Sequence, residues 1–196
     1  RANPIYKIPF SLFDIYGSFT EQKIDLPEEP IILVFGYIVD YKGFDLILKA
    51  LNSTHLSGFQ ILIFGHGFVP ELEELKKDRR CTILNRFATN AEIVHVFKRA
   101  ELVLCPYKSC SQSGIVVTAN YFEKPVFATR VGGFIEAIQN GVNGVFIESE
   151  QDIVQIFQDV AERCLSQKYQ FCFNHLDRWP EIADTYKHVL KHAVLH

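Results

Sequence analysis

The chain has 196 residues, of which 48% are hydrophobic and 22% charged, a composition typical of a globular protein with a full core. Its formal net charge of −3 argues against a broad nucleic-acid surface, which would be strongly basic. No apolar run approaches the roughly 20 residues of a membrane-spanning helix. The five cysteines include no C-x-x-C pair, which favours reduced thiols in a cytosolic protein over a disulfide framework or a zinc site.

The first 30 residues contain four prolines and show no regular hydrophobic period. Two interpretations stay open: a surface segment whose aromatic residues pack on the body, or a linker arriving from a preceding domain. The chain opens RANPIYKIPF, with neither an initiator methionine nor a signal-peptide pattern. We therefore expect a piece of a longer protein, with residues 1–30 as an interdomain or N-terminal segment and residues 31–196 as one domain.

From residue 31 onward, short apolar runs alternate with helical patterns. Continuous apolar runs of this length are typical of strands that are buried on both faces. The six predicted strands cover residues 31–35, 59–64, 81–84, 102–105, 126–129 and 145–147. Helices are predicted at 44–52, 71–77, 90–99, 115–122, between 133 and 140, at 150–164 and at 179–194. The alternation predicts an α/β fold, a Rossmann-like doubly wound parallel sheet of order 3-2-1-4-5-6 with helices on both faces.

The loop after the first strand, GYIVDYKG at 36–43, places a glycine at the strand end and Lys42 just before a helix. A permissive backbone, a helix N-terminus and an ammonium group suit a phosphate. The loop is neither G-x-G-x-x-G nor a Walker A sequence, so it excludes the two commonest nucleotide-binding loops. A solvated lysine in an ordinary connection is the alternative interpretation.

Three further loops carry polar or glycine-rich sequences at strand ends. Gly65 and Gly67 bracket His66, which would bind a ligand or merely occupy a turn. The loop around residues 109–114 offers hydroxyls to an anion or a sugar, or caps the following helix. It contains no base for a serine nucleophile and no G-x-S-x-G elbow. Gly132 and Gly133 open a short helix, where Glu136 has a sufficient structural role beside the helix dipole.

In this order, these segments resemble the C-terminal, donor-binding half of a GT-B-fold glycosyltransferase of the group 1 or family-four type. The resemblance is carried by FGYIVDYKGFD at 35–45, PYKSCSQSGIVVTANYFEKPVFAT at 106–129 and GGFIEAIQNGVNG at 132–144. The SQSG loop is similar to that of a recognisable subgroup. The resemblance implies a cytoplasmic enzyme, or one at the cytoplasmic face of a membrane. Its N-terminal domain would bind a glycan or lipid-linked acceptor, and this domain a nucleotide-diphosphate sugar.

The resemblance also assigns roles. The loop at 36–43 would face the diphosphate, residues 85–87 the base, the loop at 109–115 the sugar and phosphates, and Thr118 the ribose. No cofactor beside the nucleotide sugar and no catalytic metal are implied, and any catalytic histidine would belong to the N-terminal domain. The predicted donor-binding residues are Gly36, Tyr37, Lys42, Gly43, Gly65, His66, Asn85, Arg86, Phe87, Tyr107, Ser109, Ser111, Gln112, Ser113, Gly114, Ile115 and Thr118.

Two departures from the family pattern matter. The arginine that many members carry beside the first-strand glycine is replaced, because Tyr37 and Ile38 stand there. The usual pair of glutamates is also missing, with Cys110 and Thr118 in their places. The expected function is donor binding within a hexosyltransferase, with the isolated domain inactive. A non-catalytic binding module, or an epimerase or phosphorylase of the same architecture, are the alternatives, and the absent G-x-G-x-x-G argues against a dinucleotide oxidoreductase.

Overall fold

The computed structural model describes residues 14–112, 114–173, 183–184 and 187–188. Ser113 and most of the helix predicted at 179–194 lie outside these residues. The described part contains a six-stranded parallel sheet and seven α-helices, with two short 3-10 helices at Asp14–Ser18 (η1) and Asp40–Lys42 (η2).

The sheet has the order β3-β2-β1-β4-β5-β6, and every paired strand runs parallel to its neighbour. This confirms the predicted topology, and each predicted strand boundary lies within two residues of the observed one. The strands are β1 (Ile31–Phe35), β2 (Gln60–Gly65), β3 (Cys81–Asn85), β4 (Ala100–Cys105), β5 (Val126–Thr129) and β6 (Gly144–Ile147).

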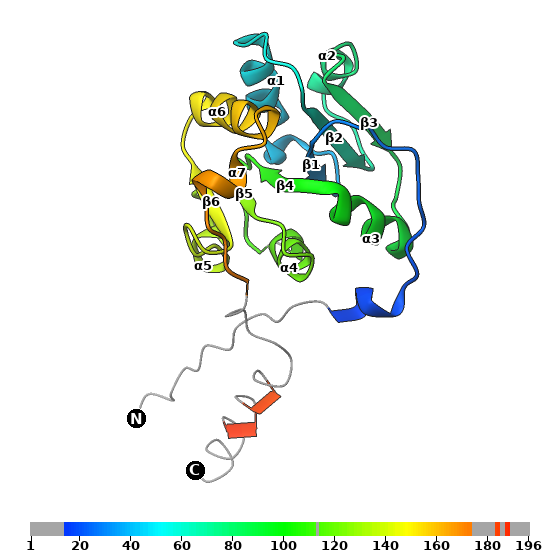
Figure 1. Cartoon of the computed structure of the whole chain (residues 1–196), viewed down its shortest axis with the longest axis vertical. Helices are drawn as coiled ribbons and strands as arrows, with labels where there is room; N and C mark the ends of the chain where they lie inside the picture. The colour runs from blue at the N-terminus through cyan, green and yellow to red at the C-terminus, as the bar shows by residue number, and fades with distance from the viewer. Residues whose placement is uncertain (1–13, 113, 174–182, 185–186, 189–196) are drawn as a thin grey trace.

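Helices cover both faces of the sheet (Figure 1). On one face pack α1 (Phe44–Asn52), α2 (Glu71–Leu75) and α6 (Glu150–Ala161), followed by the short α7 (Leu165–Lys168). On the other face pack α3 (Asn90–Arg99), α4 (Gly114–Tyr121) and α5 (Phe134–Ala137). The helices α7, η1 and η2 were not predicted, since each is too short to show a hydrophobic period.

Alternating strand residues supply the two halves of the core. In β1, Ile32 and Val34 join the cluster under α1, whereas Ile31 and Leu33 join the cluster under α3 and α4. All four are 3% exposed or less. Because successive side chains of a strand point to opposite faces, a strand covered on both sides must be apolar throughout. Burying each such side chain contributes about 1.5–3 kcal/mol, which explains why the central strands are the most apolar stretches of the sequence.

The segment before β1 packs against α3 and α4. The ring of Tyr16 lies 5.6 Å from that of Tyr121 between centroids, and Glu21 lies 2.7 Å from the ring nitrogen Nδ1 of His95. For residues 14–30 the structure therefore agrees with a segment that packs on the body, and the domain boundary at residue 30 stays a prediction.

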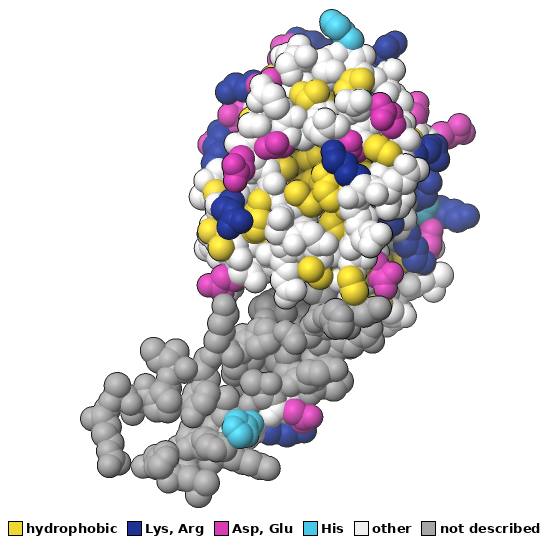
Figure 2. Space-filling model, turned by 60° about the vertical axis from the view of Figure 1, so that its left-hand side comes forward, with side chains coloured by type: hydrophobic (Ala, Val, Ile, Leu, Met, Phe, Trp, Pro, Cys, Tyr) yellow, Lys and Arg dark blue, Asp and Glu magenta, His cyan; other side chains and the backbone are white. Residues whose placement is uncertain are grey.

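Within the described residues, no helix combines the length and apolar character that crossing a bilayer requires. On the face drawn in Figure 2, hydrophobic side chains gather near the centre, with acidic and basic groups around them.

Candidate functional site

The candidate site lies where β1 and β4 end side by side. The helix after β1 packs on one face of the sheet, and the helix after β4 packs on the other. The two connecting loops therefore part, and a crevice opens between them outside the carboxyl ends of the strands. Ligands of doubly wound α/β folds bind in this crevice.

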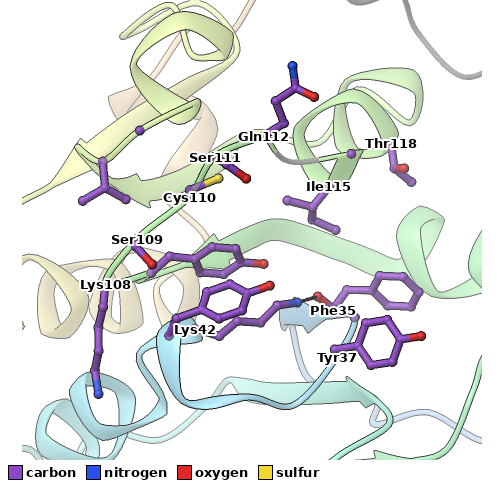
Figure 3. A pocket seen from close by; sticks show the side chains of 16 residues that line it. Phe35, Tyr37, Lys42, Lys108, Ser109, Cys110, Ser111, Gln112, Ile115 and Thr118 are labelled. Carbon is purple, nitrogen blue, oxygen red and sulfur yellow. Dashed lines mark hydrogen bonds between the residues drawn. The ribbon is translucent and has the colours of Figure 1, made fainter.

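A pocket of about 990 Å³ occupies the crevice, at the upper end of the range that is typical of ligand sites. Side chains from both loops and from the start of α4 surround it (Figure 3). Ten predicted residues line it: Gly36, Tyr37, Lys42, Tyr107, Ser109, Ser111, Gln112, Gly114, Ile115 and Thr118. The structure thus brings most of the predicted set together, and their binding roles stay predictions.

Six predicted residues do not line the pocket, and Ser113 lies outside the described residues. Gly43 and Gly65 sit at close backbone crossings, and the side chain of Asn85 exchanges two hydrogen bonds with the backbone of Gly67. Arg86 pairs with Glu92. His66 and Phe87 are exposed beside the pocket, where the Phe87 ring lies 5.9 Å from that of Tyr37 between centroids.

Sequence reasoning missed several lining residues: Phe35, Tyr41, Lys108, Cys110, Val131 and Gly132. Phe35 is the last residue of β1, and Tyr41 and Lys108 belong to the loops that follow β1 and β4. Their position directly after predicted strand ends was the available signal. Val131 and Gly132 come from the loop after β5, which lies beside the loop after β4 in the predicted strand order but was not assigned to the site.

Lys42 is the most informative residue of the pocket. Its side chain is buried, at 6% exposure, yet it makes no ion pair with any carboxylate among the described residues. Its Nζ donates one hydrogen bond, 2.9 Å long, to the carbonyl oxygen of Phe35, and it lies 5.2 Å from the centroid of the Tyr107 ring. Burial lowers the pKa of this ammonium group, which is the expected sign for a cation that has lost water without gaining an anion.

Gly36 makes room for that ammonium. Its φ is +98°, a backbone conformation that L side chains rarely adopt, and a Cβ at this position would lie 2.8 Å from Lys42 Nζ. The strand-end glycine singled out in the sequence is therefore required both by its backbone conformation and by the lysine beside it.

The second pocket lysine, Lys108, is already neutralised. Its Nζ lies 3.1 Å from Asp40 Oδ1 and 3.2 Å from Asp45 Oδ1, and its backbone N–H donates to the carbonyl of Tyr41. In Figure 3 its side chain points away from the pocket centre. Lys108 therefore joins the loops after β1 and β4, and Lys42 supplies the pocket's uncompensated positive charge within the described residues.

The loop after β4 is fixed by the glycine pair after β5. The backbone N–H of Gly133 donates to the carbonyl oxygen of Cys110 at 2.8 Å, and a Cβ on Gly132 would lie 1.5 Å from that oxygen. Cys110 and Thr118, which replace the family's usual glutamates, both line the pocket. The pocket wall therefore presents a thiol and a hydroxyl at these two places.

Arg86 and Glu92 offer a test of electrostatics beside the site. The Arg86 guanidinium contacts both oxygens of Glu92, at 2.9 and 2.7 Å, and lowers the pKa of that carboxyl to about 2. Glu92 also accepts from the backbone N–H of Thr89, and the Thr89 side chain accepts from the backbone N–H of Glu92, which makes a reciprocal capping box at the start of α3. A depressed carboxyl pKa stabilises the fold above the unfolded value, 4.5, and this stability is lost as pH falls toward 2.

We expect Glu92→Gln to lower the free energy of unfolding by about 1–2 kcal/mol at pH 7, a figure discounted for the half-exposed arginine. Urea titrations from pH 7 to pH 2.5 measure this. The difference from the parent chain should shrink as pH falls below 4.5, because Glu92 then binds a proton in the unfolded parent chain while it stays ionised in the folded one until about pH 2. A difference that stays constant with pH would contradict the role of the ion pair.

Fold and pocket together define a doubly wound α/β domain with its candidate site at the topological switch point, a class in which nucleotide binding is common. The model of the family "Glycosyl transferases group 1" matches residues 29–167. The chain belongs to this family, as the sequence resemblance predicted.

Curated relatives agree with this assignment. A D-inositol 3-phosphate glycosyltransferase of Mycobacterium marinum is 30% identical over 139 residues, which is 66% of this chain and 29% of the relative. An uncharacterised 41.2 kDa protein from the cps region of Klebsiella pneumoniae is 23% identical, over 72% of this chain and 39% of its own length. The chain therefore spans well under half of the length of these relatives.

Solved structures share the fold. HepE of Anabaena in complex with UDP-glucose matches 82% of this chain and 49% of its own, with a TM-score of 0.58 and 18% identity. Sucrose-phosphate synthase of Thermosynechococcus elongatus matches 92% of this chain and 51% of its own, with a TM-score of 0.66 and 16% identity. The C-terminal domain of LpcC from Francisella tularensis matches 75% of this chain and 87% of its own, with a TM-score of 0.60 and 19% identity.

Proposed function

We propose that this chain is the donor-binding half of a glycosyltransferase and binds a nucleotide-diphosphate sugar in the pocket between the loops after β1 and β4. The transferred hexose would go to a glycan or a lipid-linked acceptor held by an N-terminal domain of the same protein. The chain matches about half of the length of HepE and of sucrose-phosphate synthase, and the structure of HepE is a complex with UDP-glucose; both findings support this proposal. The predicted location, in the cytoplasm or at the cytoplasmic face of a membrane, belongs to the same proposal.

The buried ammonium of Lys42 is the observation that carries the proposal. A buried cation without a carboxylate partner is unfavourable unless a ligand supplies the missing anion. A diphosphate is such an anion, and it would also meet the unpaired N–H groups at the start of α4. During transfer the diphosphate leaves with increasing negative charge. A fixed cation in a pocket of low dielectric would stabilise that charge.

The exposed rings of Tyr37 and Phe87 extend the pocket toward β3. The two residues are 61% and 64% exposed, so both offer apolar surface to a flat ligand group. A nucleoside base is such a group, and stacking on aromatic rings tolerates any base. This arrangement supports the predicted position of the base near residues 85–87.

Isothermal titration calorimetry with UDP-glucose, GDP-mannose and ADP-glucose tests donor binding directly. We expect one of these donors to bind saturably, with the free nucleoside at least tenfold weaker because it lacks the diphosphate. Equal affinity for nucleoside and nucleotide sugar would show that the ammonium does not face the phosphates. If none of the three donors binds, the proposal is wrong for sugars carried by uridine, guanosine and adenosine diphosphate.

A specific observation also favours a second candidate, a binding module of the same fold that does not transfer sugar. Cys110 and Thr118 cannot reproduce the contacts that the family's glutamates would make, because a thiol and a hydroxyl lack the two acceptor oxygens of a carboxylate. Sugar transfer by the protein that contains both domains separates the candidates. Donor binding without transfer to any glycan or lipid-linked acceptor would favour the binding module.

A further inference from the structure

A second cavity, of about 660 Å³, lies at the opposite end of the sheet from the candidate donor pocket. Its wall includes Glu101, the second residue of β4, and Pro125, which directly precedes β5. The donor pocket begins after the last residue of β4, and a six-residue strand spans about 20 Å. We call this second cavity the distal groove and define it by Glu101, Glu123, Pro125, Arg163, Tyr169 and Phe171.

Two wall residues have an uncommon backbone conformation. Glu123 and Arg163 are the non-glycine residues with positive φ in the described part of the chain, each at 54°. Each follows a helix end, after α4 and α6, and the next residue's N–H reaches back five residues to a carbonyl. Glycine is the usual occupant of this position because it adopts the left-handed conformation without cost. The sequence therefore keeps a charged side chain at two places where the backbone favours glycine, and both line the distal groove.

The charged side chains that line the groove make no direct polar contact within the described part of the chain. Glu101, Glu123 and Arg163 form no ion pair or side-chain hydrogen bond with the described residues. Lys124 lies close by, since Glu101 and Glu123 both raise the pKa of its amine, although burial lowers it by more. Two carboxylates and two cations leave this region with no net charge, so it selects neither a nucleotide nor a cationic ligand.

Aromatic side chains form the apolar part of the groove. Tyr169 and Phe171 stack with centroids 5.4 Å apart, and both meet the buried ring of Phe127 edge to face. All three rings are therefore held in place, while Tyr169 and Phe171 keep part of their surface exposed. Rings fixed in this way can pack against an apolar ligand face with little loss of conformational entropy.

From these features we infer that the distal groove is a second carbohydrate site, which binds a neutral oligosaccharide. Each sugar hydroxyl both donates and accepts, so one neutral chain satisfies carboxylates and a guanidinium together. The C–H faces of a sugar ring are apolar and pack on aromatic side chains. An extended peptide fits less well, because β4 and β5 are interior strands and offer no free sheet edge. The site is independent of donor binding and lies too far from the donor pocket to hold the transferred sugar.

Titration of the isotope-labelled 196-residue chain with neutral tetrasaccharides of glucose, galactose and mannose tests the inference by amide NMR. We expect saturable shifts at Glu101, Glu123 and Arg163 with at least one of them. The double variant Glu123→Gly and Arg163→Gly should lose at least tenfold in affinity. Its melting temperature should match or exceed that of the parent chain, because glycine suits both backbone positions.

The matched control is Lys42→Met in the donor pocket, which should leave tetrasaccharide affinity unchanged. The inference fails if no tetrasaccharide binds, if shifts are confined to the donor pocket, or if the glycine variant binds as well as the parent. It also fails if the glycine variant changes the sedimentation coefficient and not sugar affinity, since the groove would then be a contact between copies of the chain. None of these outcomes depends on whether a nucleotide sugar binds elsewhere.

Discussion

Replacing Lys42 by methionine is expected to weaken donor binding by about 10- to 100-fold, as measured by calorimetry with the donor that binds best. The estimate corresponds to a hydrogen bond to a charged group, about 1.5–3 kcal/mol. Methionine replaces the aliphatic stem of lysine by an unbranched side chain only one atom shorter, so the change removes mainly the ammonium group. A higher salt concentration should lower the donor affinity of the parent chain more than that of the variant.

The same substitution should have the opposite effect on stability. Burial lowers the pKa of Lys42 from its usual 10.5. At neutral pH the protonated side chain therefore has a higher free energy in the folded chain than in the unfolded one. Lys42→Met should therefore unfold at an equal or higher urea concentration. The parent chain should gain stability relative to the variant as pH rises toward 10.5, because the unfolded state then binds more protons.

Lys108→Met is the control for both measurements. Lys108 lines the same pocket, but its ammonium already pairs with Asp40 and Asp45. Its loss should reduce donor affinity by much less than the loss of Lys42. If both variants weaken binding equally, general electrostatic attraction explains the affinity, and the buried ammonium has no special role.

The architecture was predictable because each strand of this sheet is covered on both faces. β1 reads IILVF, and all but its last residue are fully or almost fully buried. A run of this kind has few other stable environments in a globular domain, and a glycine directly after β1 and another as the last residue of β2 end the runs clearly. The handedness rules for parallel connections then leave few possible strand orders.

The site was only partly predictable, because its geometry depends on contacts between loops far apart in sequence. The sequence places Lys42 near a helix start but does not show that the side chain turns back to the carbonyl of Phe35 and is buried. Similarly, the sequence around Lys108 does not predict its two partners, Asp40 in the loop after β1 and Asp45 in α1. The distal groove has no sequence motif, since Glu123 and Arg163 share only a backbone conformation.

Gly43→Ala is expected to destabilise the chain strongly. Gly43 caps the start of α1 with φ at +73°, and a Cβ there would lie 1.8 Å from the carbonyl oxygen of Pro106. The left-handed conformation costs an alanine about 1–2 kcal/mol. Forcing the two loops apart adds about 1–3 kcal/mol, the range for overpacking. Urea unfolding should therefore show a total loss of about 2–5 kcal/mol, the sum of these two costs.

Gly141→Ala isolates the part of this loss that comes from the backbone. Gly141 has a similar φ of +80°, but nothing lies within 4 Å of the place where its Cβ would be. This variant should lose only about 1–2 kcal/mol and keep donor affinity, because Gly141 lies in the turn before β6.

In Gly43→Ala the Pro106 backbone must move, and the loops that hold Lys42 and Ser109 move with it. Donor affinity should therefore fall together with stability. If Gly43→Ala and Gly141→Ala lose equal free energy of unfolding, the two loops can separate at little cost. The contact between Gly43 and Pro106 then does not set the width of the pocket.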